Sequence, residues 1–361
     1  MNKSYLFKFH ISNINFFHSH FYSNKILFKS IFLIIFLSMI SIFLTNFIHL
    51  WILMEINTMI FIILMSMYMK KFKSTFNFFI IQSISSIMLI FLLMMKNYSF
   101  LPHNLIFNLL LILSFTLKLG LFPFFYWPPL INLNLNWILI FIMSTSQKFI
   151  PLLIFNMFFN QIKNELLTNS FILISILSSF ISTIMNFNET NFKKILTFSS
   201  TNHLSWMIFI SIFDSSMFLI YFIIYSLSMM FLCFIFNKFN MNTFMDLTKI
   251  QFFNYKKINF SLSMNLLIIS ALPPFLTFLI KINSMKIMIE NFSLFSSLLF
   301  SLISIFTIIF YMNLVIKMNM FYMIKNKFYF NLLNIKFNFF SLMIINLMSM
   351  AFLFITFYLM N

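Results

Sequence analysis

The sequence predicts an all-α integral membrane protein with about eleven transmembrane helices. Of its 361 residues, 61% are hydrophobic and only 8% are charged, whereas soluble domains carry about 25% charged residues. The apolar residues form runs of about 20, the length that a helix needs to cross a bilayer. These runs lack the strict alternation of barrel strands. Helices satisfy every backbone group within their own segment in lipid, so each run is expected to be one helical span.

The expected spans form a single polytopic domain over residues 25–361. The fourth span is interrupted near Gly120 and Pro123, and the ninth contains Pro273 and Pro274. Proline removes a backbone donor and breaks the helical ladder, so these two spans are expected to be broken helices. The eleven ranges are 27–47, 49–69, 76–95, 104–128, 136–158, 169–187, 195–213, 216–237, 261–282, 293–315 and 337–359.

The residue usage indicates a strongly AT-rich gene. There are 60 Phe and 30 Met but one Gly, and all 23 basic residues are lysines. Codons for Phe, Ile, Lys, Asn and Tyr are poor in G and C, whereas Gly, Ala, Pro and Arg mostly need them. Abundant Met fits a mitochondrial code in which ATA is read as Met. This pattern reflects mutation bias and carries no chemistry of its own.

The lysines orient the expected spans. Threading eleven spans places three lysines on one side of the membrane, namely Lys96, Lys163 and Lys286, and leaves three within the membrane. The positive-inside rule then puts the N-terminus on the matrix side, for a mitochondrial protein, and the C-terminus on the intermembrane-space side. The N-terminal side receives the remaining seventeen: Lys3, Lys8, Lys25, Lys29, Lys70, Lys71, Lys73, Lys193, Lys194, Lys238, Lys249, Lys256, Lys257, Lys317, Lys325, Lys327 and Lys336.

Several function classes are excluded by composition. A net charge of +17 could suggest nucleic acid, but the lysines gather at the ends of apolar runs, so membrane orientation explains the charge and no nucleic-acid partner is expected. The single cysteine, Cys233, excludes an internal disulfide and a thiolate metal site within the chain. A single glycine excludes a glycine-rich phosphate loop. We therefore expect no cofactor and no metal in this chain.

Residues 1–24 are too polar and mixed to form a span. They contain His10, His18 and His20, which can be read as metal ligands, but no Cys or carboxylate accompanies them. A polar N-terminal extension, or a start codon assigned too far upstream, explains them better. No secretory or transit signal with a cleavage site is evident.

Four charged residues interrupt the apolar runs, and these are the candidate functional residues. They are Glu55, Lys118, Lys148 and Lys281. A charge at membrane depth costs several kcal/mol, so such residues normally face a bundle interior or a wet cavity and often carry ions or protons. Lysine suits proton carriage because burial readily changes its proton affinity, whereas arginine stays protonated.

The prolines near two of these lysines have mirrored order. Pro123 follows Lys118 by five residues, and Pro274 precedes Lys281 by seven. Two broken helices with opposite order of break and charge fit an inverted repeat. Lys148 lies near the middle of its span, so its side chain cannot easily reach either membrane surface.

The local sequences around these residues resemble a known family. They read WILMEIN, LKLGLFPFFYWPPL, WILIFIMSTSQKFIPLL, NETNFKKILTFSSTNHLSWM and ALPPFLTFLIKIN, in this order along the chain. Together they resemble the family of NADH dehydrogenase subunit 2, the antiporter-like membrane subunits of respiratory complex I. The resemblance extends from about residue 25 to the C-terminus, and eleven spans match the shortened animal form.

The resemblance implies a role for each candidate residue. Glu55 and Lys118 would form the charge pair at the start of a half-channel, Lys148 the central relay, and Lys281 the terminal lysine near the exit. His203, in the pattern SS-x-x-H-x-x-W, has a weaker claim to the relay. The structural alternatives are an interfacial position for Glu55 or Lys281 and a hydrogen bond between helices for His203.

The resemblance also implies the partners and the setting. The chain would be a proton-translocating, non-redox subunit of NADH:ubiquinone reductase in the mitochondrial inner membrane, among other membrane subunits and lipid. NAD, FMN, iron–sulfur clusters and ubiquinone would be bound by partner subunits. Two other readings are a stand-alone cation/proton antiporter and a structural scaffold for assembly.

Some positions depart from the family pattern. The family motif PFHFW is here Pro123–Trp127 without its histidine, and the glycines that flank LPP are Ala271 and Thr277. Outside the motifs, Glu189 precedes Lys193 by four residues, the spacing of a helical ion pair.

Overall fold

The structure, a computed structural model, describes residues 29–68, 72–95, 105–161, 165–246, 256–273, 275–291 and 294–325. The expected extension over residues 1–24, the expected span 337–359 and Pro274 lie outside these ranges. Within them the chain is helical, and the one extended pairing is an isolated bridge between Asn191 and Thr243. The all-α fold class is therefore confirmed.

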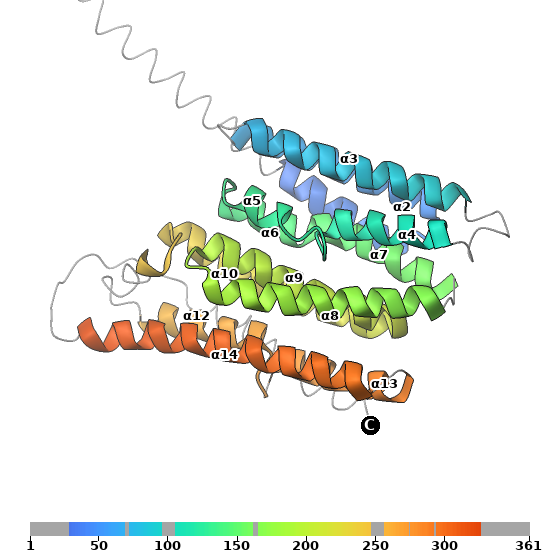
Figure 1. The fold of residues 1–361 in the computed structure, drawn as a ribbon. Coiled ribbons are helices and arrows are strands. Elements are labelled where there is room, and N and C mark those ends of the chain that lie inside the picture. Colours follow the sequence, from blue (N-terminus) through green and yellow to red (C-terminus); the bar gives the residue numbers. More distant parts are fainter. Residues whose placement is uncertain are drawn as a thin grey trace, which may run out of the picture.

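The helices lie side by side in a bundle. Figure 1 shows α2 and α3 at one edge, α8 to α10 in the middle and α12 to α14 at the other edge. A shorter apolar helix over Lys29–Phe43 precedes them. The labelled helices are α2 (Phe47–Tyr68), α3 (Phe72–Met95), α4 (Leu105–Leu119), α5 (Trp127–Asn132), α6 (Trp137–Ser144), α7 (Ser146–Gln161), α8 (Glu165–Asn188), α9 (Phe192–Phe213), α10 (Ser215–Phe239), α12 (Lys256–Ser270), α13 (Leu276–Asn291) and α14 (Leu294–Lys325).

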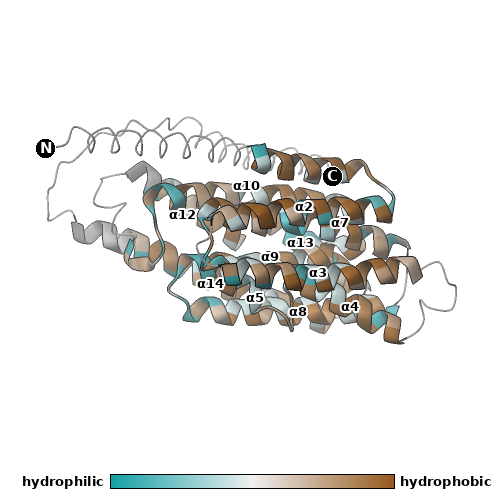
Figure 2. Cartoon of the chain, turned by 90° about the horizontal axis from the view of Figure 1, so that it is seen from above, coloured by the Kyte–Doolittle hydropathy of each residue, from teal (hydrophilic) through white to brown (hydrophobic). Residues whose placement is uncertain are grey.

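Six helical segments in the described ranges are long and apolar enough to cross a membrane. Figure 2 shows apolar residues along most of the helices and hydrophilic residues at several helix ends. The six segments are Phe47–Tyr68, Phe72–Met95, Trp137–Asn160, Glu165–Asn188, Ser215–Phe239 and Leu294–Met318.

Both expected helix breaks are present. Helix α4 ends at Leu119, immediately before Gly120, and α5 begins only at Trp127. Helix α12 ends at Ser270 and α13 begins at Leu276, so the expected span 261–282 is two helices that together reach Asn291.

A third break, at Thr145, was not expected. It divides α6 from α7 three residues before Lys148, and neither glycine nor proline stands there. The hydroxyls of Ser144 and Thr145 both donate to the carbonyl of Phe141, at 3.0 and 2.8 Å. Such hydroxyl bonds to the preceding turn compete with the helical ladder and favour bending. Thr145 itself has a non-helical backbone, with φ −114° and ψ −81°. The same hydroxyl bonds at Ser199, Ser200 and Thr201 leave α9 unbroken, so the Ser-Thr-Ser run accompanies this break and does not by itself account for it.

Helix α9 lies at the centre of the bundle. Every residue from Ile195 to Ser211 is buried, so this helix has no face left for lipid. It is as long as α2, at 22 residues, but it is not one of the six apolar segments because its middle is rich in Ser, Thr, Asn and His. Its polar side chains are enclosed by neighbouring helices and can form an internal polar path.

The boundaries of α9 correct one expected contact. Glu189 pairs with Lys194 at 2.7 Å, not with Lys193, because Glu189 lies in the turn between α8 and α9, where helical spacing does not apply. Lys193 instead donates to the carbonyl of Leu135 at 2.8 Å. At the other end, Asp214 caps α10 by accepting from the backbone N–H of Ser216 at 2.9 Å.

Gly120 is required by the geometry of the first break. Its φ is +72°, and a Cβ there would lie 2.5 Å from Cγ of Pro128. Gly120→Ala is expected to destabilise the protein by at least about 1–2 kcal/mol, the cost of left-handed backbone for an L-residue. Thermal unfolding of the purified assembly measures this loss. Leu113→Ala, at a more exposed position on α4, is the control, and equal stability of the two variants would contradict the prediction.

Candidate functional site

Glu55 and Lys118 form an ion pair between α2 and α4. Lys118 lies at the last turn of α4, and its Nζ donates to Oε1 of Glu55 at 3.3 Å. The lysine side chain is 1% exposed and the glutamate side chain 22%. The carbonyl of Lys118 accepts from Nε2 of Gln82 at 3.3 Å, which ties α3 to the end of α4. The two charges implied as a pair by the family resemblance are therefore in direct contact.

Two amides hold α2, the helix of Glu55, against the break beside Lys148. Nδ2 of Asn57, two residues after Glu55, donates to the carbonyl of Ser146 at 3.3 Å. Nε2 of Gln147 donates back to the carbonyl of Asn57 at 3.2 Å. Sequence reasoning missed these amides, although each stands within two residues of a candidate charge.

Lys148 is buried in α7 and points at α9. Its Nζ donates to Oγ of Ser200 at 3.0 Å. In the described part of the chain, no carboxylate lies within ion-pair distance of this ammonium. The neighbour of this buried ammonium is therefore a hydroxyl, where Lys118 has a carboxylate.

His203 lies one turn further along α9. Its Nδ1 is 2.8 Å from the hydroxyl of Tyr221 on α10, and its ring centroid is 5.1 Å from that of Tyr225. The imidazole is buried. The expected hydrogen bond between helices is therefore present. Along α9, His203 lies between Ser200, which contacts Lys148, and Trp206, which lies near Lys281.

Lys281 is also buried, in the second turn of α13. Its Nζ lies 5.0 Å from the ring centroid of Trp206 on α9. The expected span ended one residue after this lysine, which suggested an interfacial position. The helix instead continues for ten residues beyond it, so Lys281 lies inside the bundle.

One row of side chains on α9 brings these groups together. Ser200, His203 and Trp206 are spaced three residues apart, so they lie on one face of the helix. Ser200 contacts Lys148, His203 contacts Tyr221, and Trp206 contacts Lys281. The Glu55–Lys118 pair stands apart from this row, and the amide contacts of Asn57 and Gln147 hold α2 against α7.

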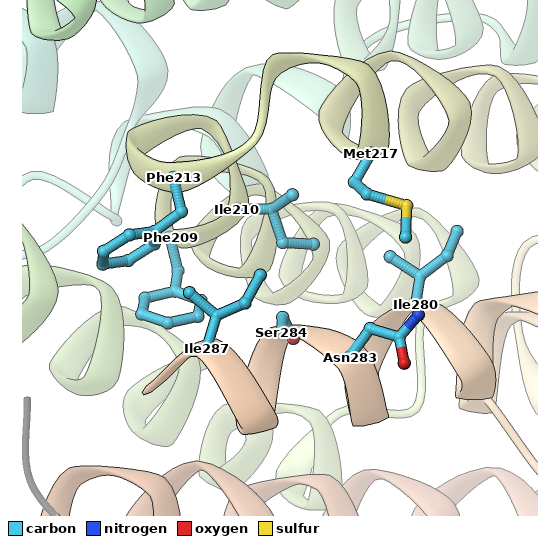
Figure 3. Close-up of a pocket in the computed structure, with 8 residues that line it drawn as sticks. All are labelled: Phe209, Ile210, Phe213, Met217, Ile280, Asn283, Ser284 and Ile287. Carbon is cyan, nitrogen blue, oxygen red and sulfur yellow. The ribbon is translucent and has the colours of Figure 1, made fainter. Parts of the chain in front are cut away.

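A small pocket lies between α9, α10 and α13, with Ile280, the residue before Lys281, in its lining (Figure 3). Its walls come from α9, α10 and α13, and its volume of about 10 Å³ is close to the least that holds one water molecule. The lining is largely apolar, with Asn283 and Ser284 of α13 as its polar members. Within the described ranges, no three His, Cys, Asp or Glu side chains gather in a group that could hold a metal ion.

Comparison with known proteins assigns the family. A family model described as "NADH:quinone oxidoreductase/Mrp antiporter, TM" matches residues 44–307. NADH-ubiquinone oxidoreductase chain 2 of Anopheles gambiae is 32% identical over 291 residues, covering 77% of this chain and 83% of that protein. The chain belongs to this family. The chain 2 proteins of Aedes aegypti, 34% identical over 53% of this chain and 54% of that protein, and Artemia franciscana, 31% identical over 73% and 81%, agree with the assignment.

Two solved structures share the fold of this chain. A chain of respiratory complex I from Thermus thermophilus has a TM-score of 0.64 at 14% identity, covering 74% of this chain and 64% of that chain. A chain of the archaeal membrane-bound sulfane sulfur reductase has a TM-score of 0.70 at 14% identity, covering 85% and 68%. The family expected from the charged motifs is thus confirmed, and its fold agrees.

Two residues at the second break, where the resemblance implies glycines, have structural consequences. Ala271 has a φ of +59°, the left-handed region where glycine is favoured. Thr277 has a hydroxyl that a glycine lacks, and it donates to the carbonyl of Ile268 at 2.9 Å. The break is therefore present although Ala271 carries the cost of left-handed backbone, and the hydrogen bond of Thr277 joins the two sides of the break.

Proposed function

We propose that this chain is a proton-translocating membrane subunit of NADH:ubiquinone oxidoreductase. Protons are carried by Lys118, Lys148 and Lys281, with Glu55 controlling the first lysine and His203 standing between the last two. The chain performs no redox chemistry itself. NAD, FMN, iron–sulfur clusters and ubiquinone belong to partner subunits, whose reaction drives the protons.

The observation that carries the proposal is the polar row of α9 that touches two buried lysines. A lysine inside a membrane protein is costly, and three of them along one bundle are difficult to explain by packing. Lys148 and Lys281 reach the same face of α9 through Ser200 and Trp206. Their enclosure inside the bundle supports conduction through the protein, away from lipid.

The ion pair supplies a means of control. A carboxylate next to a lysine favours the charged lysine, so the distance between Glu55 and Lys118 sets how tightly that proton is held. A change in the partner subunits that separates the pair would release the Lys118 proton toward the next carrier. The amides of Asn57 and Gln147 hold the helix of Glu55 against the helix of Lys148.

The setting follows from the same proposal. The apolar spans require a membrane, and the family relatives named chain 2 favour the mitochondrial inner membrane. The lysine bias along the sequence favours an N-terminus on the matrix side. Other membrane subunits of the same complex are the expected partners.

Measurements on the isolated chain and on the assembled complex distinguish this function from a stand-alone antiporter and from an assembly scaffold. Purified alone in liposomes with a pH-sensitive dye, the chain is expected to show no cation-driven proton exchange, because its carriers depend on the NADH-oxidising partners. In the assembled complex, neutralising Lys118, Lys148 and Lys281 together is expected to abolish proton uptake. Exchange by the isolated chain would favour an antiporter, and intact uptake by the triple variant would favour a scaffold.

A further inference from the structure

The three buried lysines differ in what holds the ammonium group. Lys118 has a carboxylate at 3.3 Å, and Lys148 has a hydroxyl at 3.0 Å. Nζ of Lys281 is buried and has no hydrogen-bond partner among the described residues. A buried charge without compensation is strongly unfavourable, so the protonated form of Lys281 needs a different kind of partner.

The group next to that ammonium is the indole of Trp206. The distance of 5.0 Å from Nζ to the ring centroid is within the range of a cation–π interaction. Trp binds cations best among the aromatic residues, and the interaction is strongest where water is excluded. Trp206 is itself buried, and its ring packs on Phe300 with centroids 4.7 Å apart. The ring face is thereby fixed in place beneath the lysine.

We infer that Trp206 is the positioning residue of Lys281, and that its indole face binds the ammonium in the place that a carboxylate has at Lys118. This inference rests on the proposed role of Lys281 as a proton carrier. An aromatic face stabilises the cation but does not take its proton, so Lys281 can be charged without being neutralised by its partner. His203, one turn before Trp206, is close enough to interact with Lys281 electrostatically.

The test compares two replacements of similar size in the assembled complex. Trp206→Phe keeps an aromatic face, and it removes an indole N–H that has no hydrogen-bond partner among the described residues. Trp206→Leu removes the face. The measurement is NADH-driven proton uptake per assembled complex in liposomes. We expect the Trp206→Phe variant to retain most of this uptake. We expect the Trp206→Leu variant to lower it roughly tenfold, as for loss of a desolvated cation–π contact. Trp206→Met, whose side chain fills irregular gaps, replaces Leu if the Leu variant does not assemble.

Two controls separate this effect from general packing. Phe209→Leu alters a ring that packs on the same Phe300, with centroids 5.6 Å apart. Trp137→Leu alters the indole near Lys193, at 5.8 Å, a lysine outside the proposed relay. Both are expected to keep proton uptake near the parent level. A structure of the Trp206→Leu or Trp206→Met complex is expected to show Nζ of Lys281 moved from its parent position.

Two lysine variants on α13 distinguish failure of this inference from failure of the proposed function. Lys281→Met is expected to abolish uptake, whereas Lys286→Met, at an exposed position of the same helix, is expected to preserve it. Full uptake by Lys281→Met would overturn the carrier role and the Trp206 inference together. Loss in Lys281→Met, with equal uptake by the Phe, Leu and Met variants of Trp206, would overturn the Trp206 inference alone.

Discussion

Replacing Lys148 by alanine is expected to abolish NADH-driven proton uptake by the assembled complex. The ammonium is buried and bonded to Ser200, and no other lysine in the described ranges approaches that hydroxyl. Loss of a proton-transfer group typically costs about a hundredfold or more. Proton uptake per assembled complex, measured in liposomes with a pH-sensitive dye, reports the loss.

Arginine at the same position separates charge from proton transfer. Lys148→Arg keeps a positive charge, but arginine does not release its proton in proteins. We therefore expect Lys148→Arg to assemble and to fail in uptake as alanine does. Lys194→Ala is the matched control, because that lysine is partly exposed and paired with Glu189. Parent-level uptake by either Lys148 variant would exclude this lysine as a carrier.

Breaking the Glu55–Lys118 pair is expected to cause the second large loss. Glu55→Gln leaves a buried ammonium without its counter-charge. We expect this to destabilise the protein by about 2–3 kcal/mol, which is less than the loss from breaking a fully enclosed pair, because the carboxylate is partly exposed. Without this carboxylate Lys118 loses the charge that stabilises its protonated form. Proton uptake is therefore expected to fall at least about tenfold, in keeping with the free energy lost with that partner. Lys118→Met is expected to abolish uptake.

The Glu189–Lys194 ion pair provides the comparison. Glu189→Gln and Lys194→Met alter a pair that is partly exposed on both sides, and such pairs contribute about 0–1 kcal/mol. Uptake is expected to stay near the parent level in both variants. A thermodynamic cycle from thermal unfolding of the assemblies should give a larger coupling for Glu55–Lys118. Equal coupling in the two cycles would argue against a special role for the first pair.

The sequence allowed much of the fold to be predicted because lipid imposes few choices. Long apolar runs must be helices there, and the breaks at Gly120 and Pro273 follow from residues with strong backbone preferences. The break at Thr145 was missed since neither glycine nor proline stands there, and the hydroxyl bonds of Ser144 and Thr145 also occur in unbroken helices such as α9. The Glu189–Lys193 pair was wrong because its helical spacing crosses a turn between α8 and α9.

The candidate charges could be found in the sequence, but their partners could not. Glu55 and Lys118 differ in depth by about 12 Å when only the rise per residue is counted, and only the packing of α2 against the broken end of α4 brings them into contact. The partners of Lys148 and Lys281 come from another helix. The three-residue spacing of Ser200, His203 and Trp206 was a readable signal for one polar row, and only His203 was taken from it.

The complete enclosure of α9 has a consequence for how the chain enters its membrane. Partition into lipid favours segments with apolar surface to offer, and α9 carries Ser, Thr, Asn and His along its middle with every side chain from Ile195 to Ser211 covered by protein. The insertion machinery cannot release such a segment singly at little cost. We expect its flanking helices α8 and α10, which are apolar enough to span a membrane, to leave the translocation site together with it.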